Sequence, residues 1–212
     1  MNTPLRQRSV KEWLFRPFTY VAGWQAMLLG IAVILLTGAI GSFSGAHFDG
    51  VVDMHTGTRT PLLVFLCEGL IDWLLLAIVL LIFGLVISKT NFRVVDLLGT
   101  QALARWPFVF SAIIAFPSAR SSRRFGEYLL ATIRNPANSP PISHTDVIIF
   151  IAVTVVVLLM ICWFIALAYR SYSISCNIRG GKAIGTFIAA ILIAEILSKP
   201  LMAWVFKTVL PR

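Results

Sequence analysis

The sequence predicts an all-α protein that crosses a membrane several times. Of its 212 residues, 58% are hydrophobic and 13% are charged, whereas a soluble domain has roughly 25% charged residues. Several apolar runs also approach the length of about 20 residues that a helix needs to cross the hydrocarbon core of a bilayer. Together these observations predict a polytopic membrane protein with about four to six spans and no sizeable soluble domain.

The net charge of +9 is typical of a membrane protein with basic loops. Excess lysine and arginine usually lies in cytoplasmic loops or contacts lipid headgroups. Nucleic-acid binding would need a soluble surface, so we expect a bilayer with anionic headgroups as the partner and no nucleic acid. The cysteines, Cys67, Cys162 and Cys176, form no C-x-x-C motif, which argues against a disulfide framework and a zinc site.

Residues 1–23 are predicted to form an amphipathic segment in the headgroup layer. Ser9 and Glu12 have the spacing of a capping box, and aromatic side chains alternate with basic ones over residues 9–20. Such rings favour the interface, while the cations favour lipid phosphates. A disordered basic tail is the alternative. The apolar stretch that follows is as long as a span, so we expect a retained first helix rather than a signal peptide.

The first span is predicted over residues 24–45. Small residues gather on one face of this helix, and Gly41 and Gly45 form a small-xxx-small motif, which lets two helices approach closely. Gly181 and Gly185 are expected to have the same packing role at the start of the last span. We expect the partner helix within the same bundle. A homo-oligomer or another membrane protein is the alternative partner.

Residues 46–61 connect the first two spans and contain His47, Asp49, Asp53 and His55. Two histidines and two carboxylates could bind a divalent metal. Nothing in the sequence fixes these side chains relative to one another. We therefore expect a polar, solvated hairpin loop without a metal.

The second and third spans are predicted over residues 62–88 and 94–119. Arg105 and Pro107 interrupt the third one, and its unbroken apolar part is too short to cross a bilayer. It either crosses as a broken helix, which gives five spans, or re-enters, which gives four. The distribution of basic residues favours four spans, but the family resemblance described below favours five, and we expect five.

A basic amphipathic helix is predicted over residues 120–134. Its cations surround aromatic and aliphatic residues, a pattern typical of helices on a membrane surface. We expect four of them to contact lipid headgroups: Arg120, Arg123, Arg124 and Arg134. A proline-rich linker follows. The fourth and fifth spans are predicted over residues 146–169 and 183–210, which completes a membrane domain over residues 24–210.

Catalytic motifs are absent from the sequence. It contains no G-x-S-x-G, H-E-x-x-H, phosphate-binding loop or dinucleotide fingerprint. His144 stands alone beside the linker and is expected on the surface. We therefore expect no enzyme activity and no cofactor.

Two motifs in the second half of the chain suggest a family. The third span opens with QALARWPFVFSAII; the fourth carries Trp163 and leads through a short polar turn to Lys182 and Ala183. Their order and spacing resemble the Yip family (Ypt/Rab-interacting membrane proteins) over residues 20–208. The resemblance implies five spans, a cytoplasmic N-terminus and a non-catalytic scaffold or interaction role. Without a long polar N-terminal region, the chain looks similar to bacterial members, and we expect it in the bacterial inner membrane.

Four charged residues inside predicted spans form the candidate site. Glu68 and Asp72 are one helical turn apart in the second span, and Glu195 and Lys199 have the favourable i,i+4 order in the last. A lone charge near mid-bilayer costs roughly 2.5–3.5 kcal/mol. From the helical rise, Lys199 falls at a depth between the first two acids. We therefore expect Lys199 to pair with both, with Glu195 joining the same cluster.

This cluster supports two functional hypotheses. In a scaffold, the charges are neutralised and dry, and the protein acts through helix packing and lipid contact. In a small transporter or channel component, the charges face water and relay ions or protons. One lysine cannot neutralise three acids, which keeps the second hypothesis open.

Overall fold

Five long apolar helical segments make up the fold. The structure is a computed structural model, and it describes residues 10–57, 60–136 and 141–209. Within those ranges, five segments are long and apolar enough to cross a membrane, as the sequence predicts. They are α2 (Gly23–Ser44), α3 (Leu62–Ile87), α4 with α5 (Val94–Leu103 and Pro107–Arg134), α6 (His144–Ser175) and α7 (Gly180–Val209).

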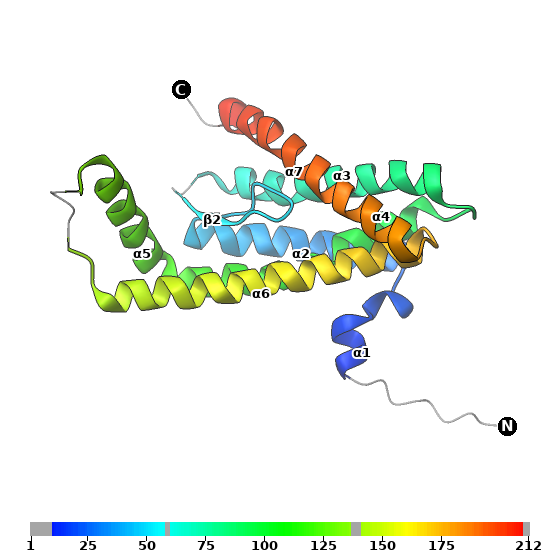
Figure 1. The fold of residues 1–212 in the computed structure, drawn as a ribbon, viewed down its shortest axis with the longest axis horizontal. Helices are drawn as coiled ribbons and strands as arrows, with labels where there is room; N and C mark the ends of the chain where they lie inside the picture. The colour runs from blue at the N-terminus through cyan, green and yellow to red at the C-terminus, as the bar shows by residue number, and fades with distance from the viewer. Residues whose placement is uncertain (1–9, 58–59, 137–140, 210–212) are drawn as a thin grey trace.

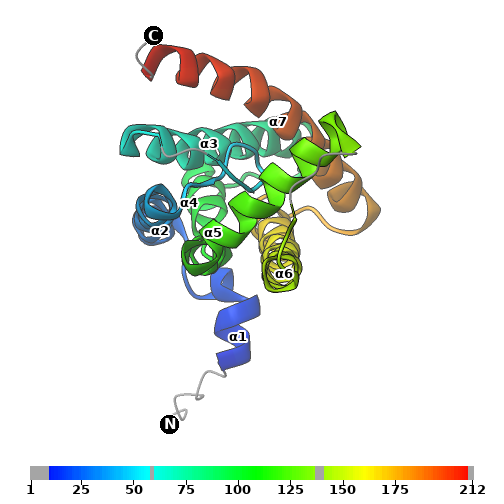
Figure 2. The ribbon, with the colours of Figure 1, turned by 90° about the vertical axis from the view of Figure 1, so that its left-hand side faces the viewer.

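The five segments run through the bundle in alternating directions. In Figure 1, α2, the α4–α5 pair and α7 run from right to left, and α3 and α6 run back. Seen along the bundle in Figure 2, α3 and α7 lie on one side, α1 on the other, and α2, α5 and α6 between them. The third segment therefore passes through the bundle as a broken helix rather than re-entering.

The break in the third segment lies at residues 104–106. Pro107 then starts α5, where its missing N–H costs no helical hydrogen bond. The predicted span over 94–119 and the predicted surface helix over 120–134 are wrong as separate elements, because α5 continues through Pro117 to Arg134. Figure 1 and Figure 2 both show that α5 bends within its length, as expected for a helix with an internal proline.

A close helix contact joins α2 and α4 through two glycines. A Cβ atom on Gly30 would collide with Ala102 and the backbone of Leu103, and one on Gly99 would lie 2.5 Å from the carbonyl oxygen of Gly23. Because glycine has no side chain, the two backbones can approach to this distance. The contact explains why these positions are glycine.

The predicted packing glycines have different surroundings. Gly41 faces the backbone of Ala46, and Gly45 ends α2 with a φ of +71°, a left-handed conformation that glycine adopts without strain. A Cβ atom on Gly181 or Gly185 would meet nothing within 4 Å. The predicted packing role of Gly181 and Gly185 is therefore wrong in the folded chain, and that of Gly45 is replaced by a helix cap.

The predicted N-terminal segment contains a short helix, α1 (Val10–Phe15), and the 3-10 turn η1 (Pro17–Thr19). In Figure 1, α1 lies across the direction of the long helices, which is the orientation of a helix in a membrane interface. The indole N–H of Trp163 donates to the carbonyl of Leu14 over 3.2 Å, which ties α1 to α6. Ser9 of the predicted capping box lies outside the described residues.

The loop between α2 and α3 lies inside the bundle. It contains two-residue strands, β1 (Ala46–His47) and β2 (His55–Thr56), which pair antiparallel at its base. Figure 1 shows it in cyan between α2 and α3. Its first half is buried, with Phe48 4% exposed and Val51 fully enclosed. The prediction of a solvated hairpin is therefore wrong, because apolar residues of the loop join the main hydrophobic core.

Candidate functional site

Glu68 is bound by the loop rather than by Lys199. Its Oε1 atom lies 2.7 Å from Nδ1 of His47, and its Oε2 atom accepts the backbone N–H of Phe48 over 3.1 Å. Glu68 and His47 are both buried. The predicted pairing of Glu68 with Lys199 is therefore wrong, since the buried loop occupies both carboxylate oxygens.

Lys199 also pairs with the loop. Its Nζ atom lies 2.5 Å from Asp53 Oδ2 and 3.9 Å from Asp49 Oδ1. Glu195 Oε1, one turn away on α7, lies 3.3 Å from the same ammonium, and its Oε2 accepts the N–H of Val52 over 3.1 Å. We call these five groups the loop cluster: Asp49, Asp53, His55, Glu195 and Lys199. Glu195 and Lys199 lie as their spacing predicts, but loop acids replace Glu68 and Asp72 as partners.

Asp72 faces a cation that sequence reasoning missed. Its strongest attraction to a charged group is to Arg105, from the break between α4 and α5. Asp72 is fully enclosed, and Arg105 is 3% exposed. No direct ion pair joins them among the described residues, so the pairing predicted with Lys199 is replaced by a longer-range attraction. We call Asp72 and Arg105 the inner pair.

Several polar atoms around the inner pair have no hydrogen-bond partner within the described parts of the chain. They are both carboxylate oxygens of Asp72, Nη2 of Arg105, and the amide oxygen of Gln101, four residues before Arg105. Buried polar atoms are usually satisfied by protein or by ordered water. These atoms therefore offer unused hydrogen-bonding positions to water.

A small cavity opens beside Arg105. Its lining comes from α2, the loop, α3 and the start of α5: Ile34, Thr37, Gly38, Phe48, Phe65, Gly69, Arg105 and Phe108. The guanidinium carbon also lies 5.4 Å and 5.7 Å from the ring centroids of Phe164 and Phe108, a distance at which cation–π attraction acts. The cavity has room for about one water molecule.

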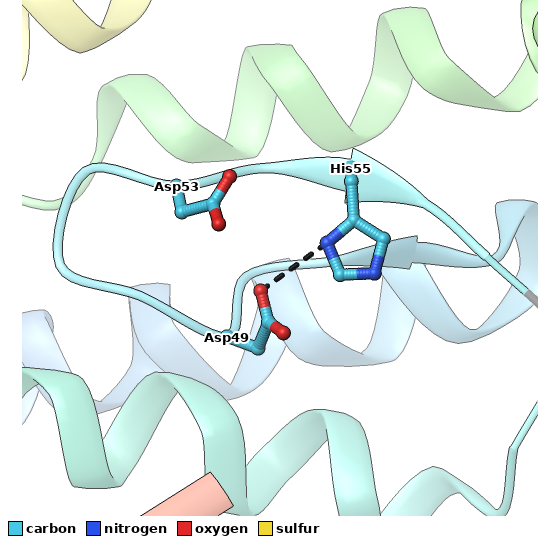
Figure 3. A group of neighbouring side chains, drawn as sticks. All are labelled: Asp49, Asp53 and His55. Atoms are coloured by element: carbon cyan, nitrogen blue, oxygen red, sulfur yellow. Dashed lines mark ion pairs between the residues drawn. The ribbon is translucent and has the colours of Figure 1, made fainter. Parts of the chain in front are cut away.

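Within the described parts of the chain, three members of the loop cluster form a group that could hold a metal. Each of these residues offers one ligand atom, and the three atoms lie within 4.8 Å of one another: Asp49, Asp53 and His55. Figure 3 shows the contact between His55 and Asp49. Carboxylate and imidazole together suit a divalent transition metal. Lys199 already supplies a positive charge to both carboxylates. A metal at this position would have to displace it, and we assign none.

The contact between His55 and Asp49 predicts a titration. Nδ1 of His55 lies 3.2 Å from Asp49 Oδ1, and this contact raises the pKa of His55 above 6.5. Burial acts to raise the pKa of Asp49, but His55 and Lys199 outweigh it, so that pKa falls below 3.8. The His55 contribution to stability is complete below pH 6.5 and is lost as pH rises through the raised pKa. The Asp49 contribution is complete above pH 3.8 and is lost on acidification through the lowered pKa.

A histidine-selective NMR titration checks the raised pKa of His55. Asp49→Asn should move the pKa of His55 back towards 6.5, because the main cause of its shift is removed. Asp53→Asn serves as the control and should move it less, since Asp53 contributes only a weaker charge effect. An unchanged His55 pKa in Asp49→Asn would contradict the contact.

The basic part of α5 presents its arginines outward. Arg120, Arg123, Arg124 and Arg134 are all exposed, as headgroup contact requires. Arg124 also pairs with Asp146 of α6 over 3.2 Å, and Ser121 donates to the same carboxylate over 2.7 Å. These contacts attach the helix beyond Pro117 to α6.

Comparisons of the chain with protein-family models, curated proteins and solved structures give no match. The Yip resemblance therefore stays a prediction from sequence motifs. The loop cluster and the inner pair carry the functional argument by their own geometry.

Proposed function

We propose that this protein moves protons across a membrane along its buried ionisable side chains. The observation that carries the proposal is the inner pair, where Asp72 and Arg105 are buried with unbonded polar atoms. Ionisable groups inside membrane proteins are costly and commonly mark ion or proton pathways. A scaffold needs such groups directly paired and dry, whereas a relay needs them within reach of water.

Further polar groups lie in the segments that carry the inner pair. Asp72 is electrostatically coupled to Glu68, Glu195 and Asp49. On α4, five residues before Arg105, the hydroxyl of Thr100 lies 2.6 Å from that of Ser171 and 3.1 Å from that of Ser175. We call this series, from the loop cluster through the inner pair to Thr100, the path.

The charges along the path favour protons and cations over anions. Five carboxyl groups but only two permanent cations belong to it: Asp49, Asp53, Glu68, Asp72 and Glu195 against Lys199 and Arg105. Two histidines, His47 and His55, contact these acids, and an imidazole ring can accept or donate a proton. Acids and imidazoles in contact can pass a proton by successive short transfers. The cavity beside Arg105 is too small for a hydrated ion, which favours protons over metal cations.

A liposome assay tests the proposal. The purified protein is reconstituted with an internal pH dye, and a potassium diffusion potential drives protons inward. We expect acidification faster than in protein-free liposomes, and we expect Asp72→Asn to abolish it because an amide cannot carry the proton. Glu127→Gln, at an exposed position of α5, is the matched control and should leave the flux unchanged. Wild-type flux at the protein-free level, or full flux in Asp72→Asn, would contradict the proposal.

The second candidate is the non-catalytic, Yip-like scaffold of the bacterial inner membrane. It is supported by the five alternating segments that the resemblance implies. In such a protein the outward arginines of α5 bind anionic headgroups, and the buried charges serve the fold alone. The two candidates predict opposite results in the liposome assay, because a scaffold passes no protons.

A further inference from the structure

We propose that residues 46–57 form a plug that closes the path at the loop cluster, and that Glu68 and Glu195 latch it. The proposal rests on the proposed proton path, because a plug matters only where a path exists. Four steps support it: the burial of the loop, its position next to the inner pair, the two carboxylates that hold it, and the glycines at its base.

The loop fills space that would otherwise connect the inner pair to the surface. Phe48 lines the cavity beside Arg105 and lies 5.5 Å from the ring of Phe108, centroid to centroid. Val51 is fully enclosed within the main core. Asp49 lies between them in sequence. Its carboxyl group is close enough to that of Asp72 for the two to interact electrostatically. Moving this part of the loop outward would expose the cavity and the inner pair to water.

Two carboxylates hold the buried half of the loop. Glu68 of α3 accepts the backbone N–H of Phe48, and Glu195 of α7 accepts that of Val52, each over 3.1 Å. Both are hydrogen bonds to acidic side chains, which are stronger than neutral ones when the acid is ionised. The paired strands join the loop to itself only at its base. The carboxylates therefore fasten the loop backbone to α3 and α7, in addition to the contacts of Lys199 with the loop acids and the burial of Phe48 and Val51.

Each latch carboxylate also faces other charged or titratable groups. Glu68 faces His47, and Asp72 follows one turn later on the same helix. Glu195 faces Lys199, which also contacts the two loop acids Asp49 and Asp53. Proton transfer onto either latch acid removes the charge that strengthens its bond to the loop. The residues that would conduct are thus the residues that hold the plug closed.

Glycines stand at both ends of the loop. Gly45 has a left-handed φ of +71°, and its carbonyl accepts the N–H of Gly57 over 2.8 Å. Glycine tolerates a wider range of backbone conformations than other residues. Rotation at these two positions can carry residues 46–56 outward while α2 and α3 stay in place.

Cysteine labelling tests the plug without requiring proton flux. Val51→Cys is placed in a background with Cys67, Cys162 and Cys176 changed to alanine, and the protein is reconstituted in nanodiscs, where both faces are accessible. A charged maleimide should label Cys at position 51 slowly. Glu195→Gln should raise the rate about tenfold, the factor that corresponds to one lost charge-assisted hydrogen bond. Adding Glu68→Gln should raise it further.

Three controls define the outcomes. Thr56→Cys, at an exposed loop position, should label rapidly in every background. Glu127→Gln should leave the labelling of position 51 slow. Unchanged size-exclusion profiles and helicity show that the fold persists, and Glu195→Gln alone still tests the latch if the double variant fails to fold.

Labelling at position 51 as fast as at position 56 in the latched protein would overturn the plug. Slow labelling in Glu195→Gln would overturn the latch. A latched plug together with no proton flux in liposomes would instead contradict the proposed function and leave the loop movement standing, so the two failures are distinguishable.

Discussion

Arg105→Met is expected to destabilise the folded protein by about 1–3 kcal/mol, less than the loss of a directly bonded buried ion pair, because Asp72 and Arg105 attract each other without direct contact. The substitution keeps a long side chain against Phe108 and Phe164 but removes the positive charge that faces Asp72. Asp72 then remains fully enclosed, and no other cation among the described residues has a comparable effect on it. Reversible unfolding in mixed detergent micelles measures the change.

The double variant Arg105→Met with Asp72→Asn should recover part of this loss, because it leaves no buried charge at the inner pair. Arg123→Met makes the same substitution at an exposed position of α5 and should change stability by no more than about 0.5 kcal/mol. Equal losses in the single and double variants would show that Arg105 acts through packing rather than through charge.

Gly30→Ala is expected to destabilise the protein by about 1–3 kcal/mol, the range typical of overpacking. The new methyl group would overlap Ala102 and the backbone of Leu103, so α2 and α4 would have to separate. Backbone cannot rotate away as a flexible side chain can. Unfolding of the variant under the same conditions as the wild type measures the loss.

Gly185→Ala is the matched control for this change. It is also a glycine-to-alanine substitution inside a long helix, but its Cβ atom would meet nothing within 4 Å. Alanine favours a helix over glycine by up to about 1 kcal/mol, so the variant should be slightly more stable than the wild type. A loss at Gly185 equal to that at Gly30 would indicate a contact at that face with another molecule.

The helical architecture follows from local properties of the sequence. A long apolar run such as residues 62–88 has few options in a bilayer, because only a helix satisfies its backbone within the segment. The third segment was harder to predict, since Arg105 and Pro107 resemble an interfacial end. The structure instead buries the arginine beside Asp72, a partner from another helix. No local pattern reveals such a pairing.

The candidate site was predicted in part. Glu195 and Lys199 lie on one helix, so their spacing was enough to predict their contact. The partners of Glu68 and Lys199 were wrong because the depth estimate assumed that the connecting loop stays outside the bundle. One signal was present in the sequence: Phe48 and Val51 are large apolar residues in a loop otherwise rich in polar groups. Their burial brings His47 and Asp49 inward with them.

The bond between Val52 and Glu195 joins residues 143 positions apart, and this separation has a consequence for biogenesis. During synthesis α2, the loop and α3 are made long before α7. Glu68 can therefore bind His47 and Phe48 early, whereas Asp53 can pair with Lys199 only after α7 has been made. The loop cluster can be completed only when the last helix has been inserted. A chain that stops before α7 would keep the first four of the five long segments yet lack Glu195, one of the two latch carboxylates. The proposed proton path would thus be completed last, and a chain without α7 would lack one of the two carboxylates proposed to close it.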